Sequence, residues 1–154
     1  MPLSDEACRL IRANLEDLQN GKRVKLVVIG ELTEAQLRDI NAQRHGPNHP
    51  PVVAEIVFVG HHIYKSRILQ DGYTIDDVVQ QIVSGMCSAA VVLRSPKMTA
   101  MENPNPRTDC YGNSVRDRVV FECSVRHPRP ELFSVIPKGD CIKPKKPPKG
   151  MGGF

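Results

Sequence analysis

Two strand-like segments in the C-terminal half of the chain are separated by only five residues. DRVVFECSV (117–125) and ELFSVI (131–136) are rich in β-branched and aromatic residues, and RHPRP lies between them. A connection this short joins antiparallel neighbours, because a parallel crossover needs a dozen residues or more. The sequence therefore predicts an antiparallel hairpin with RHPRP as its solvent-exposed tip.

The other segments place helices early in the chain and strands late. Apolar residues recur at helical spacing after Ser4, a predicted N-cap, and capping-box spacing follows Thr33 and Thr74. We expect an α+β fold with mainly N-terminal helices packed on a mostly antiparallel sheet. The expected helices cover residues 5–18, 33–43, 63–70 and 74–85, and the expected strands before the hairpin cover 23–29, 52–59 and 89–94.

Length and composition indicate one globular domain over residues 1–137. Within it, residues 95–111 are rich in proline and asparagine and predict a long loop. Residues 138–154 are rich in proline, lysine and glycine and predict a disordered basic tail, because they have little apolar surface to bury. That tail holds five of the 21 basic residues and one of the 17 acidic residues, so residues 1–137 have no net charge.

Several classes of protein are disfavoured by the sequence. The N-terminus has no signal-peptide layout and no apolar run is long enough to span a membrane, so we expect a cytoplasmic protein unless a dedicated machine exports it. The five scattered cysteines predict free, buried thiols, and we expect no metal or other cofactor. Phosphate-binding glycine loops and the G-x-S-x-G nucleophile motif are absent from the sequence.

Adjacent histidines, His61 and His62, follow the apolar segment 52–59, and Lys65 and Arg67 come shortly after them. An imidazole titrates near neutral pH, and nearby cations stabilise charge that develops on a phosphate. If the strand continues through Gly60, alternation places the two rings on opposite faces, and His62 is the preferred candidate. The bland interpretation is an exposed histidine pair beside a solvated helix face.

Three further residues are weaker candidates for contacts to a substrate. Arg94 follows an expected strand, Tyr111 precedes the hairpin, and Ser134 lies in the last strand. Arginine and hydroxyl groups bind phosphate, but the same residues are equally common as surface or sheet positions.

Residues 53–137 resemble small bacterial domains of the barnase, EndoU, colicin and RelE-like ribonuclease superfamily, many of which are toxins. The resemblance depends on a histidine after a strand, an arginine on the next helix, a glycine–apolar–Thr turn, an acidic–apolar pair and a C-terminal antiparallel sheet. The chain departs from the family pattern at Asp71, where an arginine is usual, and in the His–Arg spacing, which is five residues instead of four. The matching positions are His62, Arg67, Gly72-Tyr73-Thr74, Asp77-Val78 and Gly85.

The resemblance implies a ribonuclease-toxin-like core over residues 52–137, with residues 1–50 as an N-terminal elaboration. It implies metal-independent RNA cleavage by attack of the ribose 2′-hydroxyl. His62 or His61 would move the proton, and Lys65 and Arg67 would stabilise the phosphate. RNA is then the substrate and a cognate inhibitor protein a partner. The alternatives are a non-catalytic RNA- or protein-binding module and an accessory protein with incidental histidines.

Overall fold

The computed structural model describes residues 3–42, 44, 50–87, 90–93, 99–109, 111–124 and 127–137. It shows an α+β fold whose helices lie mainly in the N-terminal half, as the sequence predicts. The helices are α1 (Asp5–Gln19), α2 (Glu34–Ala42), α3 (His61–Ile63), the π-helical segment η1 (Tyr64–Gln70) and α4 (Ile75–Gly85). The strands are β1 (Val27–Glu31), β2 (Glu55–Phe58), β3 (Val91–Leu93), β4 (Thr99–Glu102), β5 (Arg107–Thr108), β6 (Ser114–Val115), β7 (Arg118–Ser124) and β8 (His127–Ile136).

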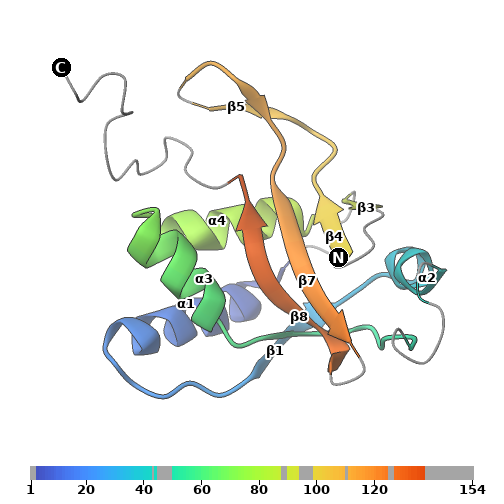
Figure 1. Cartoon of the computed structure of the whole chain (residues 1–154), viewed down its shortest axis with the longest axis horizontal. Coiled ribbons are helices and arrows are strands. Elements are labelled where there is room, and N and C mark those ends of the chain that lie inside the picture. Colours follow the sequence, from blue (N-terminus) through green and yellow to red (C-terminus); the bar gives the residue numbers. More distant parts are fainter. Residues whose placement is uncertain are drawn as a thin grey trace.

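Six strands form one sheet in the order β1-β2-β8-β7-β4-β3. All neighbours in it are antiparallel except β2 and β8, which pair in parallel through Val57 and Glu131. The long β7–β8 hairpin occupies the middle of the sheet, and α3 and α4 pack against it (Figure 1). One apolar core joins the helices to the sheet and includes fully buried side chains from α1, α4 and both hairpin strands, among them Ile11, Ile82, Phe121 and Val135.

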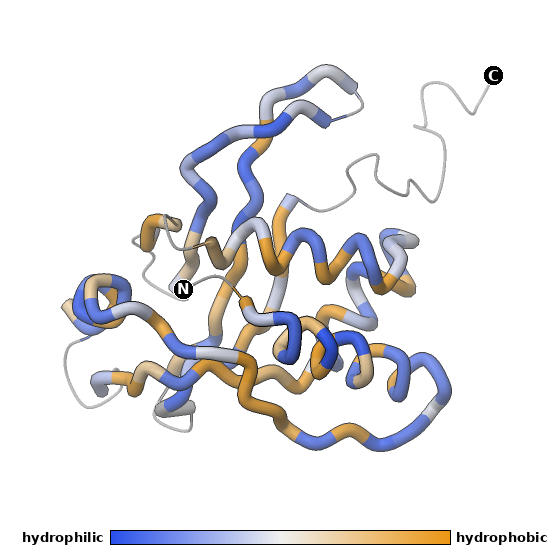
Figure 2. The backbone as a smooth tube through the Cα atoms, turned by 180° about the vertical axis from the view of Figure 1, so that it is seen from behind, coloured by the Kyte–Doolittle hydropathy of each residue, from blue (hydrophilic) through white to orange (hydrophobic). Residues whose placement is uncertain are grey.

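The second sheet consists of β5 and β6 alone, in an arm formed by residues 103–117. The arm extends beyond the end of β7 and is mostly hydrophilic (Figures 1 and 2). Its base is fixed by Asp117, which is 4% exposed and accepts hydrogen bonds from Arg107 and from the Ser84 hydroxyl of α4. The arm is therefore attached to the core through a buried carboxylate.

Several predicted elements differ in the structure. The predicted loop 95–111 contains β4 and β5, because β4 pairs with strands on both sides and this pairing outweighs the nearby prolines. The predicted strand 23–29 begins only at Val27, where pairing with β2 begins. The segment RHPRP is not only a tip, since β8 already begins at His127.

The three described cysteines are free, as predicted, but the predicted burial is confirmed for only one of them. Cys123 is buried and free, and burial raises the pKa of its thiol. Cys8 and Cys87 are also free but only half-buried. Cys110, Cys141 and the predicted basic tail lie outside the described residues.

The close approach of α4 to β7 depends on Gly85, the last residue of that helix. An added Cβ at Gly85 would lie 2.9 Å from Val119 Cγ1 and 3.2 Å from the Val119 backbone nitrogen. We expect Gly85→Ala to lower the free energy of unfolding by about 1–3 kcal/mol through overpacking, measured by urea denaturation. Gly30→Ala is the matched control, because the nearest atom there is 3.9 Å away, and equal losses for the two variants would contradict this packing argument.

Candidate functional site

The two histidines lie in the first turn of a helix and not at the end of a strand. β2 ends at Phe58, and Gly60 adopts a left-handed conformation (φ 89°) that turns the chain into α3. The strand does not continue through Gly60, so the condition for placing the two rings on opposite faces of a strand is not met. Both His61 and His62 are exposed.

The ring of His62 stacks on Phe133, a half-buried residue of β8. The ring centroids are 4.0 Å apart and the planes differ by 14°. The backbone of the same turn is also held, because the Ser66 hydroxyl donates to the His62 carbonyl at 2.7 Å. The structure therefore gives His62 an aromatic support that the sequence does not reveal.

Burial of one face of the ring lowers the pKa of His62 below its ordinary value of 6.5. The positive charges of Arg67 and Lys65 lower that pKa further, and the negative charge of Glu122 opposes them. The lowered pKa favours the neutral form of the His62 imidazole near neutral pH. In this form it can accept a proton.

A pocket of about 200 Å³ lies beside the histidines, between the end of β2 and β8. Glu131 contributes a half-buried carboxylate to the same pocket. The parallel pairing of Val57 with Glu131 places this carboxylate beside the histidines. In the sequence, the only signal is that ELFSVI begins with an acidic residue. The lining residues are Val59, Gly60, His61, His62, Ile63, Glu131, Leu132 and Phe133.

Arg67 is brought near His62, but its guanidinium is bound by the protein. The side chain is 6% exposed, its Nε donates to the Val135 carbonyl at 2.8 Å, and its Nη2 donates to Ser134 Oγ at 2.9 Å. Its Nη1 lies 3.3 Å from Asp71 Oδ2 in an ion pair. Ser134, a predicted substrate contact, is therefore a buried partner of Arg67.

Among the remaining predicted site residues that the structure describes, neither Lys65 nor Tyr111 lines the pocket. Lys65 is exposed on η1, close enough to His62 to affect its pKa. Tyr111 is 54% exposed at the tip of the β5–β6 arm, away from α3 (Figure 1). Arg94 lies outside the described residues.

Comparison of the sequence with models of known protein families gave no match, and neither did comparison with curated proteins or solved structures. The described ranges contain no group of three or more His, Cys, Asp or Glu side chains placed to hold a metal ion. No helix in that part of the chain is long and apolar enough to cross a membrane. The site is therefore interpreted from its own geometry.

The environment of His62 predicts a depressed titration midpoint in ¹H–¹⁵N NMR spectra. We expect a midpoint below 6.5 in the intact protein, since burial and two cations disfavour the imidazolium. Lys65→Ala should raise the midpoint and Glu122→Gln should lower it, while Lys65→Arg should leave it in place. A wild-type midpoint at or above 6.5 would contradict the assigned environment.

The bonds of Arg67 predict a structural loss that a lysine cannot repair. Arg67→Lys removes the fork that binds the Val135 carbonyl and Ser134, leaving buried polar groups unpaired. We expect the free energy of unfolding to fall by about 2–4 kcal/mol in urea denaturation. Arg38→Lys, the same change at an exposed position of α2, should shift it by less than about 0.5 kcal/mol.

Proposed function

We propose that this protein is a metal-independent endoribonuclease of the toxin-like kind, acting in the cytoplasm, with His62 as its general base. The observation that carries the proposal is the neutral, exposed imidazole of His62, fixed on Phe133 at the edge of a pocket and next to cationic side chains. A base with these properties suits removal of a proton from a ribose hydroxyl near neutral pH.

In the proposed reaction the His62 imidazole takes the proton of the 2′-hydroxyl. The 2′-oxygen then bonds to the adjacent phosphorus as the bond from phosphorus to the 5′-oxygen breaks. The 5′-oxygen leaves with a proton from water or from His61, giving a 2′,3′-cyclic phosphate and a 5′-hydroxyl. Lys65, exposed on η1, is the cation available to the phosphate oxygens.

The winding of η1 supports a shared role for His62 and Arg67. Members of the ribonuclease superfamily that the sequence resembles have these residues four apart, whereas this chain has them five apart. In a π-helix the hydrogen bonds connect residues five apart, as between the Asp71 amide and the Ser66 carbonyl here. The wider turns of the π-helix accommodate the one extra residue between His62 and Arg67. The positive charge of Arg67 still lowers the pKa of His62.

A second candidate function is binding of RNA or a protein partner, such as a cognate inhibitor, without catalysis. The observation that favours it is the engagement of Arg67, whose N–H groups point to Val135, Ser134 and Asp71. Lys65, exposed on η1 near His62, is then a cation that a ligand could reach. A module of this kind would hold its ligand without turnover.

Purified protein incubated with total RNA in EDTA tests the two functions. We expect fragments that end in cyclic phosphate, and a loss of roughly 10²–10⁴-fold in rate for His62→Ala, the usual contribution of a general base. The acidic limb of kcat/KM should lie below pH 6.5, because the lowered pKa keeps His62 unprotonated there.

His61→Ala removes the neighbouring imidazole and should cost less than His62→Ala, because water can replace His61 as the proton donor to the leaving oxygen. Equal cleavage by wild type and His62→Ala would exclude His62 as the base. RNA binding by the wild type with no cleavage product would instead establish the binding module.

A further inference from the structure

We propose that Asn14, on helix α1 and far from His62 in the sequence, is a positioning residue that fixes the backbone turn carrying His62. Its Nδ2 donates a hydrogen bond to the Val59 carbonyl at 2.9 Å, across 45 residues of sequence. Val59 is the last residue before the left-handed Gly60, and His61 and His62 follow at once. The amide of Asn14 therefore holds the backbone at the point where the chain leaves β2 for α3.

Packing against Gly60 makes this contact specific. An added Cβ at Gly60 would lie 2.2 Å from Asn14 Oδ1 and 3.0 Å from the Phe58 ring. The amide of Asn14 thus occupies the space that any side chain at residue 60 would need. The positive φ of Gly60 and the absence of a side chain there are both required, so the turn and Asn14 fit only as a pair.

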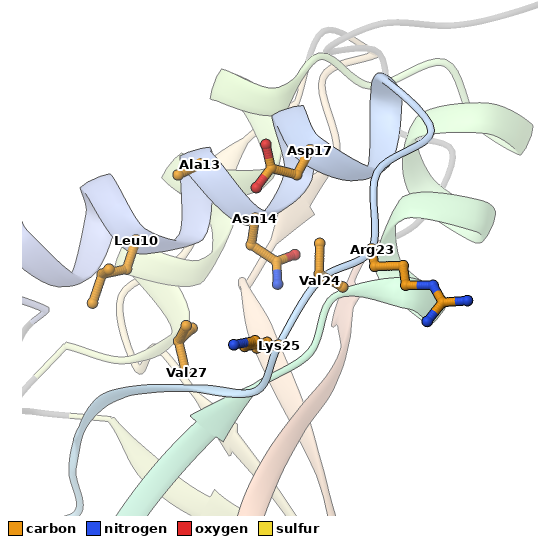
Figure 3. A pocket seen from close by; sticks show the side chains of 8 residues that line it. All are labelled: Leu10, Ala13, Asn14, Asp17, Arg23, Val24, Lys25 and Val27. Atoms are coloured by element: carbon orange, nitrogen blue, oxygen red, sulfur yellow. The ribbon is translucent and has the colours of Figure 1, made fainter.

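The oxygen of this amide has no hydrogen-bond partner in the described chain, although Asn14 is only 6% exposed. Figure 3 shows Asn14 pointing from α1 toward the segment 23–27, and Asp17 of α1 and Lys25 of that segment line a cavity of about 320 Å³ between them. The oxygen is closed off from this cavity's solvent, because its own accessible area is essentially zero. A buried acceptor without a partner is costly, but an apolar side chain of similar shape would lose the hydrogen bond to the Val59 carbonyl as well.

Positioning explains why an amide suits this site despite that cost. Only a donor can hold the Val59 carbonyl, and the turn it fixes determines whether His62 lies on Phe133. The catalytic meaning of this role rests on the proposed function, but the placement of the His62 ring can be measured without any activity.

Gln81 of α4 offers a matched control in the same chain. It is also a buried amide, 2% exposed, whose Nε2 donates to a backbone carbonyl, that of Pro137, at 3.1 Å. Its Oε1 likewise has no partner in the described part of the chain. Gln81→Leu therefore repeats the chemical change of Asn14→Leu at a site that does not bear on the histidine turn.

The experiment compares Asn14→Leu and Gln81→Leu in the full chain by NMR and by RNA cleavage. For Asn14→Leu we expect the His62 midpoint to rise toward 6.5 and its ring protons to lose the upfield shift from Phe133. We also expect kcat on RNA to fall at least tenfold, because small displacements of a catalytic group are costly. Gln81→Leu should leave all three quantities at their wild-type values.

Asn14→Ser, which adds no bulk, gives the same measurements if the leucine variant does not fold. Wild-type His62 signals in a folded Asn14 variant, or equal changes in Gln81→Leu, would overturn the positioning role. A protein that never cleaves RNA but whose His62 signals respond to Asn14 variants would refute the proposed function alone. Normal cleavage and normal His62 signals in Asn14→Leu would refute this inference alone.

Discussion

The buried guanidinium of Arg67 is the interaction on which the histidine region depends. β8 runs well past its pairing with the shorter strand β2, so its far half needs another partner on that side. Arg67 supplies one by binding the Val135 carbonyl and Ser134, with Asp71 as its counter-ion. A buried cation is tolerated only when its charge and its N–H groups are matched in this way. The same bonds fasten η1, and with it the turn that bears His62, to the middle of the sheet.

This arrangement also accounts for two features that look anomalous in the sequence. Asp71 appears to remove positive charge from a prospective phosphate site, but in the structure it neutralises an arginine that is already internal. The five-residue spacing from His62 to Arg67 appears too long for one helical turn, but η1 is wound as a π-helix. The guanidinium of Arg67 is therefore committed to contacts within the protein.

The sequence predicts most of the fold where the signals are local. α1 and α4 begin at the capping residues Ser4 and Thr74, and the β7–β8 hairpin follows from its short connection. β4 and the π-helical winding were missed, since strand pairing and distant contacts determine them. The residues of the candidate site also fall into those that the sequence reveals and those that it does not. His62 stands out by residue type, whereas Phe133, Glu131 and Asn14 reach it through the sheet register and the packing of α1, which no local pattern encodes.

Several departures from regular backbone conformation and hydrogen bonding lie around residues 59–67. A left-handed glycine, a π-helical segment, a buried arginine and an amide oxygen without a partner all adjoin the turn at residues 59–67. The π-helical winding and the buried amide oxygen, which has no partner among the described residues, are less favourable than the regular alternatives, and such departures are expected where a site imposes its own geometry. Together they fix a single imidazole against Phe133, open on its other face to solvent. These constraints are concentrated at the turn that carries His62, the residue whose ring stacks on Phe133.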